Sequence, residues 1–278
     1  MESKRLNYLD NIKWITVVLV VIYHIIYLFN NSGVISNINV KGIPIMDSFL
    51  IFVYSWFMCL LFVGSILIVL IRKIDKKDKI GRVCEKINLP ILFSLVFIVW
   101  GSSFILNTPL ITVYRFGIYL FMMLLGYYVF SNQELIKKLE KVYIPLSIIS
   151  IFIGITYVIT YYGVNYADNS VLNDLFTNVY LWIAILSILG TGSKCLNFKN
   201  KFTEYMTKNN FNIYILHYIV VLLLGYVTVT FLHLPFILNY IIILLGTIIL
   251  LPVLIEIVKR IPIIRFMVLG ISKARYRK

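Results

Sequence analysis

The sequence predicts an all-α fold, a polytopic bundle of transmembrane helices that forms a single domain over residues 1–278. Hydrophobic residues make up 60% of the chain and charged residues only 14%. The mean hydropathy is +0.91. This composition excludes an ordinary soluble globular domain. The third observation is that the apolar residues fall into long uninterrupted stretches separated by polar segments.

Eight apolar stretches can be marked, and each is long enough to cross a bilayer, some of them with tilt. In chain order they are residues 14–29, 49–71, 89–106, 110–130, 142–162, 172–190, 211–232 and 236–258. The residues from Met1 to Arg5 resemble the start of a signal peptide, but no small-residue cleavage site follows. We therefore expect the first stretch to remain as a signal anchor.

The net charge of +14 could suggest binding to nucleic acid, but its distribution favours a membrane topology. With a cytoplasmic N-terminus, the basic residues gather on the inner side. They number three before the first stretch, seven in 72–88, three in 131–141, four in 191–210 and seven from Lys259 onward. Only Lys41 and Arg115 fall outside. The positive-inside rule thus predicts eight spans with both termini in the cytoplasm and no nucleic-acid partner.

The first stretch contains one ionisable side chain, His24. At about 1.5 Å per residue, its distance from Trp14 places it roughly 15 Å deep, near the bilayer midplane. Because lipid offers no hydrogen-bond partner, His24 should face the protein interior. It is either a neutral histidine bonded to a neighbouring helix or a functional base. Lys13, eleven residues earlier, shares its helical face at the membrane surface.

The segment 72–88 carries seven basic and three acidic residues on the predicted inner side. One interpretation is a surface that faces solvent or lipid headgroups. The other is a docking site for a phosphorylated cytosolic ligand. Arg82 and Lys86 share one helical face. Pro90 predicts that a basic cytoplasmic helix turns into the membrane at this point.

Polar residues also mark the seventh and eighth stretches. The sequence Asn209 to Asn212 is expected to cap the seventh span, with His217 on the order of 10 Å inside the membrane. Glu256 is expected to form an ion pair at the rim with Lys259.

Two further polar residues lie toward the outer side. Arg115 is expected to snorkel to the outer surface, and His233 to lie in an outer loop. The three cysteines show no paired spacing, so we expect reduced thiols and no metal site.

Several motifs, taken in order, resemble the integral-membrane acyltransferase family 3. Lys13, ten residues and then His24 is similar to the family's arginine-x10-histidine signature, with lysine in place of arginine. The other similar segments are Trp56 to Val63, Arg82 to Pro90, Phe121 to Phe130 and Phe211 to His217. By this resemblance the chain is identified as a short and partly divergent member. The family usually has about ten core spans.

The resemblance implies an enzyme that transfers an acyl group, most simply acetyl, from cytosolic acyl-CoA to a hydroxyl of an envelope or extracellular carbohydrate. Acyl-CoA would be a co-substrate, with no permanently bound cofactor. Its phosphates would dock on Lys13, Arg82 and Lys86. His24 would act as general base, with Lys13 as the other residue of the catalytic motif. Asp10 would either orient Lys13 or cap the start of the helix.

The resemblance leaves the role of His217 open between assisting His24 and a structural hydrogen bond. It also implies a multi-pass protein of the bacterial cytoplasmic membrane, in contact with lipids and with a carbohydrate or lipid-linked glycan. Two alternatives remain open at this point. One is a non-catalytic partner in a glycan-export complex, and the other is a transporter, since basic loops and buried histidines also suit anion or proton-coupled transport.

Overall fold

The computed structural model describes residues 6–27, 56–107, 115–166, 168–232 and 235–272. Within these residues the chain is helical without any β-strand, and an isolated bridge joins Asn107 and Arg115. The helices are α1 (Asn7–Tyr27), α3 (Trp56–Ile74), α4 (Lys79–Glu85), α5 (Leu89–Ser94), α6 (Val96–Ser102), α7 (Phe116–Tyr128), α8 (Gln133–Lys141), α9 (Tyr143–Thr160), α10 (Asn169–Leu172), α11 (Leu175–Cys195), α12 (Lys201–Val227), the π-helical turn η1 (Thr228–Leu232), α13 (Phe236–Arg260) and α14 (Pro262–Leu269). The predicted all-α class is confirmed.

Every predicted apolar stretch contains a helix in its described part. Among the described residues, five helices are long and apolar enough to cross a membrane, and a bent pair would make a sixth. The five are α1, α9, α11, α12 extended through η1, and α13. The count of eight spans and the cytoplasmic termini stay predictions.

The chain divides into two compact units. The first unit joins Met1–Ser55 to Lys199–Lys278, so the beginning and the end of the chain fold together. The second unit is Trp56–Phe198. A buried element near the N-terminus can therefore share a site with residues about two hundred positions later.

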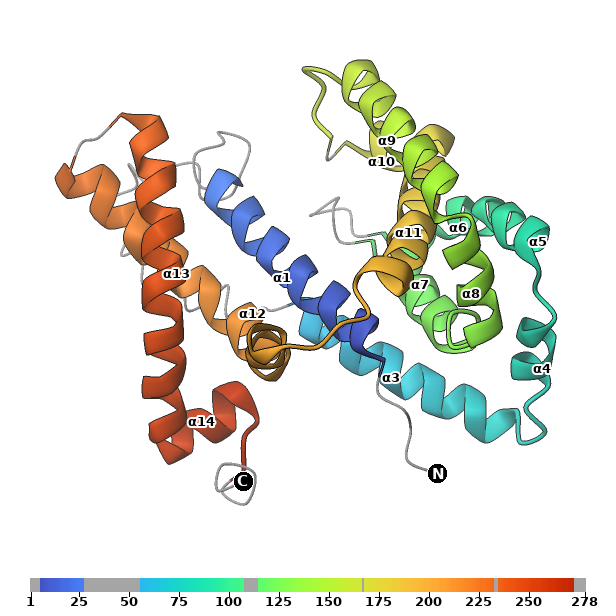
Figure 1. The fold of residues 1–278 in the computed structure, drawn as a ribbon, viewed down its shortest axis with the longest axis horizontal. Coiled ribbons are helices and arrows are strands. Elements are labelled where there is room, and N and C mark those ends of the chain that lie inside the picture. The colour runs from blue at the N-terminus through green and yellow to red at the C-terminus, as the bar shows by residue number, and fades with distance from the viewer. Residues whose placement is uncertain (1–5, 28–55, 108–114, 167, 233–234, 273–278) are drawn as a thin grey trace. The chain divides into compact units, whose positions relative to one another are not determined.

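The first unit is built on α1, α12 and α13 (Figure 1). Helix α1 runs parallel to α12, because Trp14 contacts Phe202 near the start of both helices and His24 contacts His217 further along. Helix α13 runs the opposite way, since Lys259 in its last turn reaches the first half of α12. The predicted alternation of the first, seventh and eighth stretches requires these directions.

The helices of the first unit meet through an apolar stripe. On α1 the stripe recurs every four residues, at Val17, Val21 and Ile25, as one face of an α-helix requires. It packs against Val220 and Ile255, among others, on α12 and α13. In lipid such packing gains mainly from close van der Waals contact and from polar bonds between helices. The buried polar groups of this unit therefore help to choose which faces meet.

Helix α12 begins earlier than the sequence predicted. Asn200 caps it, accepting a bond from the backbone N–H of Thr203, while the Thr203 hydroxyl accepts from the backbone N–H of Asn200. The expectation that Asn209 to Asn212 caps the span is wrong. Asn209 and Asn212 are buried inside the helix, where the amide of Asn209 donates to the carbonyl of Tyr205. The reciprocal Asn200–Thr203 pair satisfies the helix start ten residues sooner.

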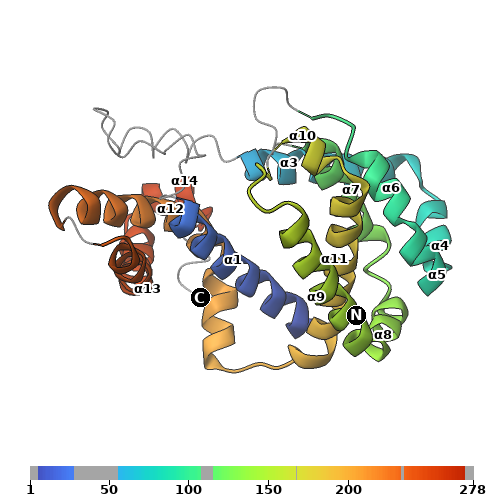
Figure 2. The ribbon, with the colours of Figure 1, turned by 90° about the horizontal axis from the view of Figure 1, so that it is seen from above.

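The second unit has α9 and α11 side by side (Figures 1 and 2). The hydroxyl of Ser147 on α9 bonds those of Ser187 and Thr191 on α11. The fully buried Trp182 of α11 donates its indole N–H to the carbonyl of Leu92 on α5 at 2.9 Å. These bonds fix the register between helices where lipid supplies no polar partner.

The basic segment of the second unit turns as the sequence predicted. Helix α4 is followed by α5 and α6 at an angle of 111°. Asn88 caps α5 by accepting the backbone N–H of Ile91, and Pro90 occupies its first turn. A proline there needs no N–H donor and has its φ angle already set for a helix. The expected turn of the basic helix at Pro90 is confirmed, and its entry into the membrane there stays a prediction.

The expectation for Arg115 is wrong. Its side chain is buried, with only 6% exposed, and it does not reach outward. The cause is the close approach of α7 to the end of α6. A Cβ atom added to Gly117 would lie 2.2 Å from the carbonyl oxygen of Ile105, so only glycine allows this contact. A side chain can snorkel only from a helix end that is open to its surroundings, and the start of α7 is covered.

Candidate active site

Two of the three histidines lie together in the first unit. His24 comes from α1 and His217 from α12, with Nδ1 of His24 3.2 Å from Nε2 of His217. His217 is buried with 3% exposed, and His24 is half-buried. The expected inward orientation of His24 is confirmed, and its partner is the residue for which the sequence left a role open. The parallel packing of α1 and α12 brings them together.

The hydrogen bonds assign the protons on both rings. Nδ1 of His217 lies 2.7 Å from the carbonyl oxygen of Tyr214 and 3.2 Å from that of Ile213. A carbonyl oxygen only accepts, so in the neutral ring Nδ1 carries the hydrogen and Nε2 has a lone pair. That lone pair accepts from Nδ1 of His24, which also lies 2.8 Å from the carbonyl oxygen of Val20. Among the described residues, the lone pair that no hydrogen bond engages is then the one on Nε2 of His24.

Aromatic rings surround the histidine pair. Tyr23 and Tyr218 both contact the ring of His24, with centroids 5.4 and 5.1 Å away. The ring of Tyr214 lies 6.0 Å from that of His217. Edge-on aromatic contacts hold an imidazole in place without competing for its nitrogens. Tyr214 belongs to the segment Phe211 to His217 that resembles a motif of the family, whereas Tyr218 had no signal beyond its position one after His217.

The cation at the rim lies on the same helix as His24. Lys13 is 64% exposed at its side chain and pairs with Asp10, Nζ to Oδ1, at 3.5 Å. Its eleven-residue separation from His24 is about three turns, so the two share a face. The structure therefore brings His24 and His217 together and pairs Asp10 with Lys13, which lies about three turns from His24 on the same helix. An exposed ammonium remains available to an anionic ligand.

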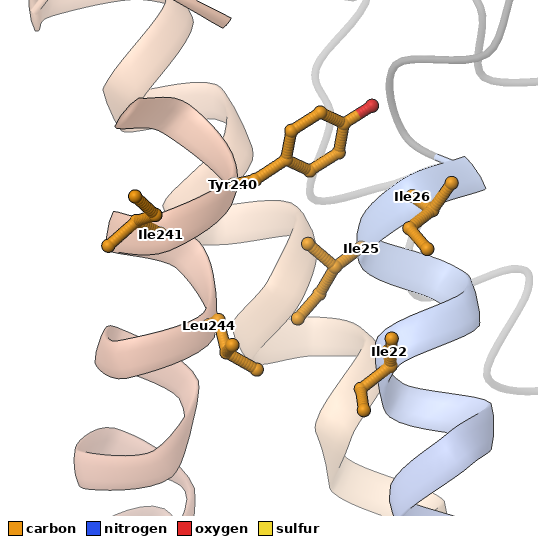
Figure 3. Close-up of a pocket in the computed structure, with 6 residues that line it drawn as sticks. All are labelled: Ile22, Ile25, Ile26, Tyr240, Ile241 and Leu244. Carbon is orange, nitrogen blue, oxygen red and sulfur yellow. The ribbon is translucent and has the colours of Figure 1, made fainter. Parts of the chain in front are cut away.

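A pocket of about 330 Å³ lies between α1 and α13 in the same unit. It is apolar and lined by Ile22, Ile25, Ile26, Tyr240, Ile241 and Leu244. Figure 3 shows Ile25 and Leu244 pointing toward each other from the two helices. His24 is two positions from Ile22 and from Ile26, which is about 160° around the helix. The pocket therefore lies on a different face of α1 from the histidine pair.

A polar cluster closes the other end of the first unit. Nζ of Lys259 donates to Oε1 of Glu256 at 2.6 Å, which confirms the expected ion pair. It also donates to Oδ1 of Asn209 at 2.9 Å, and the amide of Asn212 donates to the same oxygen. These bonds join α13 to α12. Lys259, with 12% of its side chain exposed, is therefore a link between helices, which nothing in its sequence surroundings indicated.

Arg82 and Lys86 are exposed on α4 and at its C-terminal end, in the second unit. Arg82 donates to the carbonyl of Lys77 at 2.7 Å. Backbone N–H groups of Ile80 and Lys79 bond Asp75 and hold the pKa of its carboxyl below the ordinary value. The segment is thus an ordered basic turn. Joint action of Arg82 or Lys86 with the histidines stays a prediction.

Among the described residues, no three His, Cys, Asp or Glu side chains gather closely enough to hold a metal ion. Cys59, Cys84 and Cys195 are free thiols. The chemistry open to the site within the described residues is therefore that of an imidazole pair, tyrosine hydroxyls and a nearby ammonium. Such groups transfer protons and stabilise negative charge.

The helices are apolar and enclose two hydrogen-bonded imidazoles. These features place the protein in the class of integral-membrane proteins that carry a basic group inside the helical bundle. Residues 34–256, most of the chain, match the model of a family described as an acyltransferase domain. The chain therefore belongs to this family and is a membrane acyltransferase. The comparison confirms the resemblance drawn from the motifs. Neither the curated proteins nor the solved structures returned a match to the chain.

The region that matches the family model includes one of the two histidines and not the other. His217 lies within residues 34–256, as do Arg82 and Lys86. Helix α1, with Lys13 and His24, precedes it.

Proposed function

We propose that the chain transfers an acyl group, most simply acetyl, from cytosolic acyl-CoA to a hydroxyl of an envelope or extracellular carbohydrate. The observation that carries this proposal is the bonded pair of His24 and His217 inside an acyltransferase fold. The pair offers one lone pair to a substrate, on Nε2 of His24. Proton removal from a hydroxyl is the task that acyl transfer to an alcohol requires.

The reaction proceeds in one balanced sequence. Nε2 of His24 takes the proton of the acceptor hydroxyl while its oxygen attacks the thioester carbonyl carbon. The C–S bond then breaks, the ester forms, and the coenzyme A thiolate leaves and receives the proton from His24. His217 lies 3.2 Å from the other nitrogen and stabilises the transient imidazolium through its own lone pair. A two-step route through acyl-histidine is the less favoured variant.

Lys13 gives the donor a place to dock. Its exposed ammonium lies three turns from His24 on the face that leads toward it. Lysine binds phosphate as a point charge, without the two-pronged geometry of arginine. Arg82 and Lys86 supply further exposed positive charge on the predicted cytoplasmic side. In this proposal Lys13 sets the affinity for acyl-CoA, while His24 sets the rate.

The test separates these two roles. The purified protein is titrated with acetyl-CoA, and labelled acetyl transfer to an isolated bacterial envelope fraction is followed in parallel. Lys13→Ala should weaken acetyl-CoA binding by about three- to tenfold, as the loss of one charge-assisted contact would. Lys138→Ala removes an equally exposed lysine from α8 and should change neither quantity. His24→Ala should bind acetyl-CoA normally and transfer no acetyl.

Three results would contradict the proposed acyltransferase function. A well-folded wild type that binds no acetyl-CoA overturns the proposed donor. Binding without transfer, together with a His24→Ala variant that behaves like the wild type, favours the non-catalytic partner of a glycan-export complex. Movement of a substrate across sealed vesicles without acyl transfer favours a transporter.

A further inference from the structure

The second unit contains a buried cation that the proposed reaction does not use. Arg115 precedes α7 and is 6% exposed. Among the described residues it has no ion pair. A guanidinium withdrawn from water is costly unless an opposite charge or several acceptors compensate it. The described part of the fold therefore holds a positive charge in place without supplying an ionic partner.

The polar contact between Arg115 and Asn173 engages few of the N–H donors of the guanidinium. Arginine has five N–H donors. One of them, on Nη2, points to Oδ1 of Asn173 at 3.4 Å, which is a long bond, and Nε is buried without an acceptor. Asp174, the next residue, forms no ion pair with Arg115 among the described residues, and its carboxylate accepts the hydroxyl of Tyr161. Within the described residues, which do not include 108–114 directly before Arg115, this long bond is the one hydrogen bond that the guanidinium makes.

Other unpaired polar atoms lie around the same helix ends. The hydroxyl of Ser103 and Oδ1 of Asn107 are buried without a partner, and Asn107 is bridged to Arg115 through the backbone. Oδ1 of Asn178 is likewise unpaired, while its amide donates to the carbonyls of Leu172 and Asp174 on either side of Asn173. The group thus offers positive donors, a hydroxyl and amide oxygens.

The backbone fixes this arrangement. Gly117 brings the start of α7 against the end of α6, and Trp100 of α6 donates its indole N–H to the carbonyl of Asn173 at 2.9 Å. Three separate segments therefore hold Arg115, Ser103 and Asn173 at one end of the unit. In the predicted topology this end is the outer one, since it includes the segment between the fifth and sixth apolar stretches.

We propose that Arg115, Asn173, Ser103 and Asn178 form a binding site for the oxyanion of a hydroxyl-bearing ligand, a carboxylate or a phosphate. The guanidinium pairs with the oxyanion, and the amide oxygens accept from the ligand's hydroxyls. An acidic sugar and a lipid phosphate headgroup share this chemistry. The binding itself requires no acyl transfer. Identification of the ligand as the acyl acceptor rests on the proposed function.

Equilibrium titration of the full chain in a non-ionic detergent tests the site. The probes are glucuronate and inorganic phosphate, with glucose as the uncharged match for glucuronate. We expect the wild type to bind at least one of the anions and to bind glucose at least about tenfold more weakly. No acetyl-CoA is present, so the result does not depend on the proposed reaction. A wild type that binds neither anion overturns the site.

Variants then assign the binding to Arg115. Arg115→Gln should weaken it at least about tenfold, and Arg115→Lys by less, since the charge remains while the planar donor set is lost. Arg260→Gln removes an exposed arginine from the end of α13 and should leave binding unchanged. If Arg115→Gln does not fold, Asn173→Ser takes its place and should also weaken binding. Unchanged binding in the folded variant overturns the site.

A last arm identifies the source of the oxyanion. The same titration is repeated in nanodiscs of phosphatidylcholine, with and without phosphatidylglycerol. Competition by phosphatidylglycerol for anion binding to the wild type, in excess of that by phosphatidylcholine alone, supports the site with a lipid headgroup as its occupant. Absence of competition, with anion binding retained, supports the site with a free ligand.

Discussion

At the scale of single residues, both nitrogens of His217 are engaged. Nδ1 donates to carbonyls of its own helix, and Nε2 faces His24. A group in this position orients the base and stabilises its charged form without touching substrate. His217 is therefore a positioning residue in the proposed reaction.

This role predicts a graded effect of substitution. In His217→Gln the amide oxygen can still accept from Nδ1 of His24, whereas His217→Leu offers no acceptor. We expect kcat to fall about tenfold in the first variant and about a hundredfold in the second, within the range of general-base effects. The KM for acetyl-CoA should change little. Equal losses in both variants, at equal thermal stability, would mean that His217 only fills space.

Part of the site could be predicted from the sequence alone. His24 and His217 stood out because a polar side chain at membrane depth needs an internal partner. Their pairing stayed one of two alternatives for His217, because they are separated by 193 positions and the sequence alone does not fix how α1 packs on α12. Asn209 was misjudged for a related reason. An asparagine where polar sequence meets apolar sequence resembles a cap, and only the structure reveals its bond to Lys259.

At the scale of elements, the start of α7 depends on one glycine. Gly117→Ala places a methyl group against the backbone carbonyl of Ile105, which cannot rotate away. We expect a loss of about 1–3 kcal/mol in the free energy of unfolding. Gly126→Ala, on the same helix, has open space and should be neutral or slightly stabilising. Thermal unfolding in detergent compares them, and equal midpoints would contradict the close packing of α6 and α7.

The turn before α4 predicts a dependence on pH. The backbone N–H groups of Ile80 and Lys79 lower the pKa of Asp75 in the folded state. Its contribution to local stability is therefore fully present above the unfolded value of about 3.9 and is lost as the pH falls through the lowered folded value. Asp75→Asn should lose the same contribution at neutral pH.

Hydrogen exchange measures that contribution at the amides of Lys79 and Ile80. We expect faster exchange in Asp75→Asn than in the wild type at pH near 7, with α9 and α11 unaffected. In the wild type, acid should raise the opening of this turn after correction for the intrinsic exchange rate. Unchanged protection in the variant would show that the carboxylate does not order the turn.

The sequence was enough to predict where the apolar helices lie along the chain, but not how the helices pack against one another. Each apolar stretch produced a helix, because long runs without charge have few alternatives in a membrane. The turn before Pro90 was predictable from the proline and its basic neighbours. The burial of Arg115 was not, because it depends on how closely α7 approaches α6, and a single sequence does not specify the contacts between helices.

At the scale of the whole molecule, the predicted topology makes a further claim. In a variant without native cysteines, Lys41→Cys should react with a membrane-impermeant maleimide in intact cells. Lys138→Cys should react only after the cells are permeabilised, since the positive-inside rule places α8 in the cytoplasm. Labelling of Lys138→Cys in intact cells would contradict the orientation on which the route of acyl-CoA depends.

The central claim of the proposed mechanism is that His24 is the general base of an acyltransferase. The most direct test is the rate at which the purified protein, supplied with an envelope fraction, releases thiol from acetyl-CoA. His24→Gln should lower this rate by about 10²–10⁴-fold. His233→Gln, which removes the third histidine, should leave it at the wild-type value. Equal rates in the wild type and His24→Gln, with both proteins folded, would contradict the proposed mechanism.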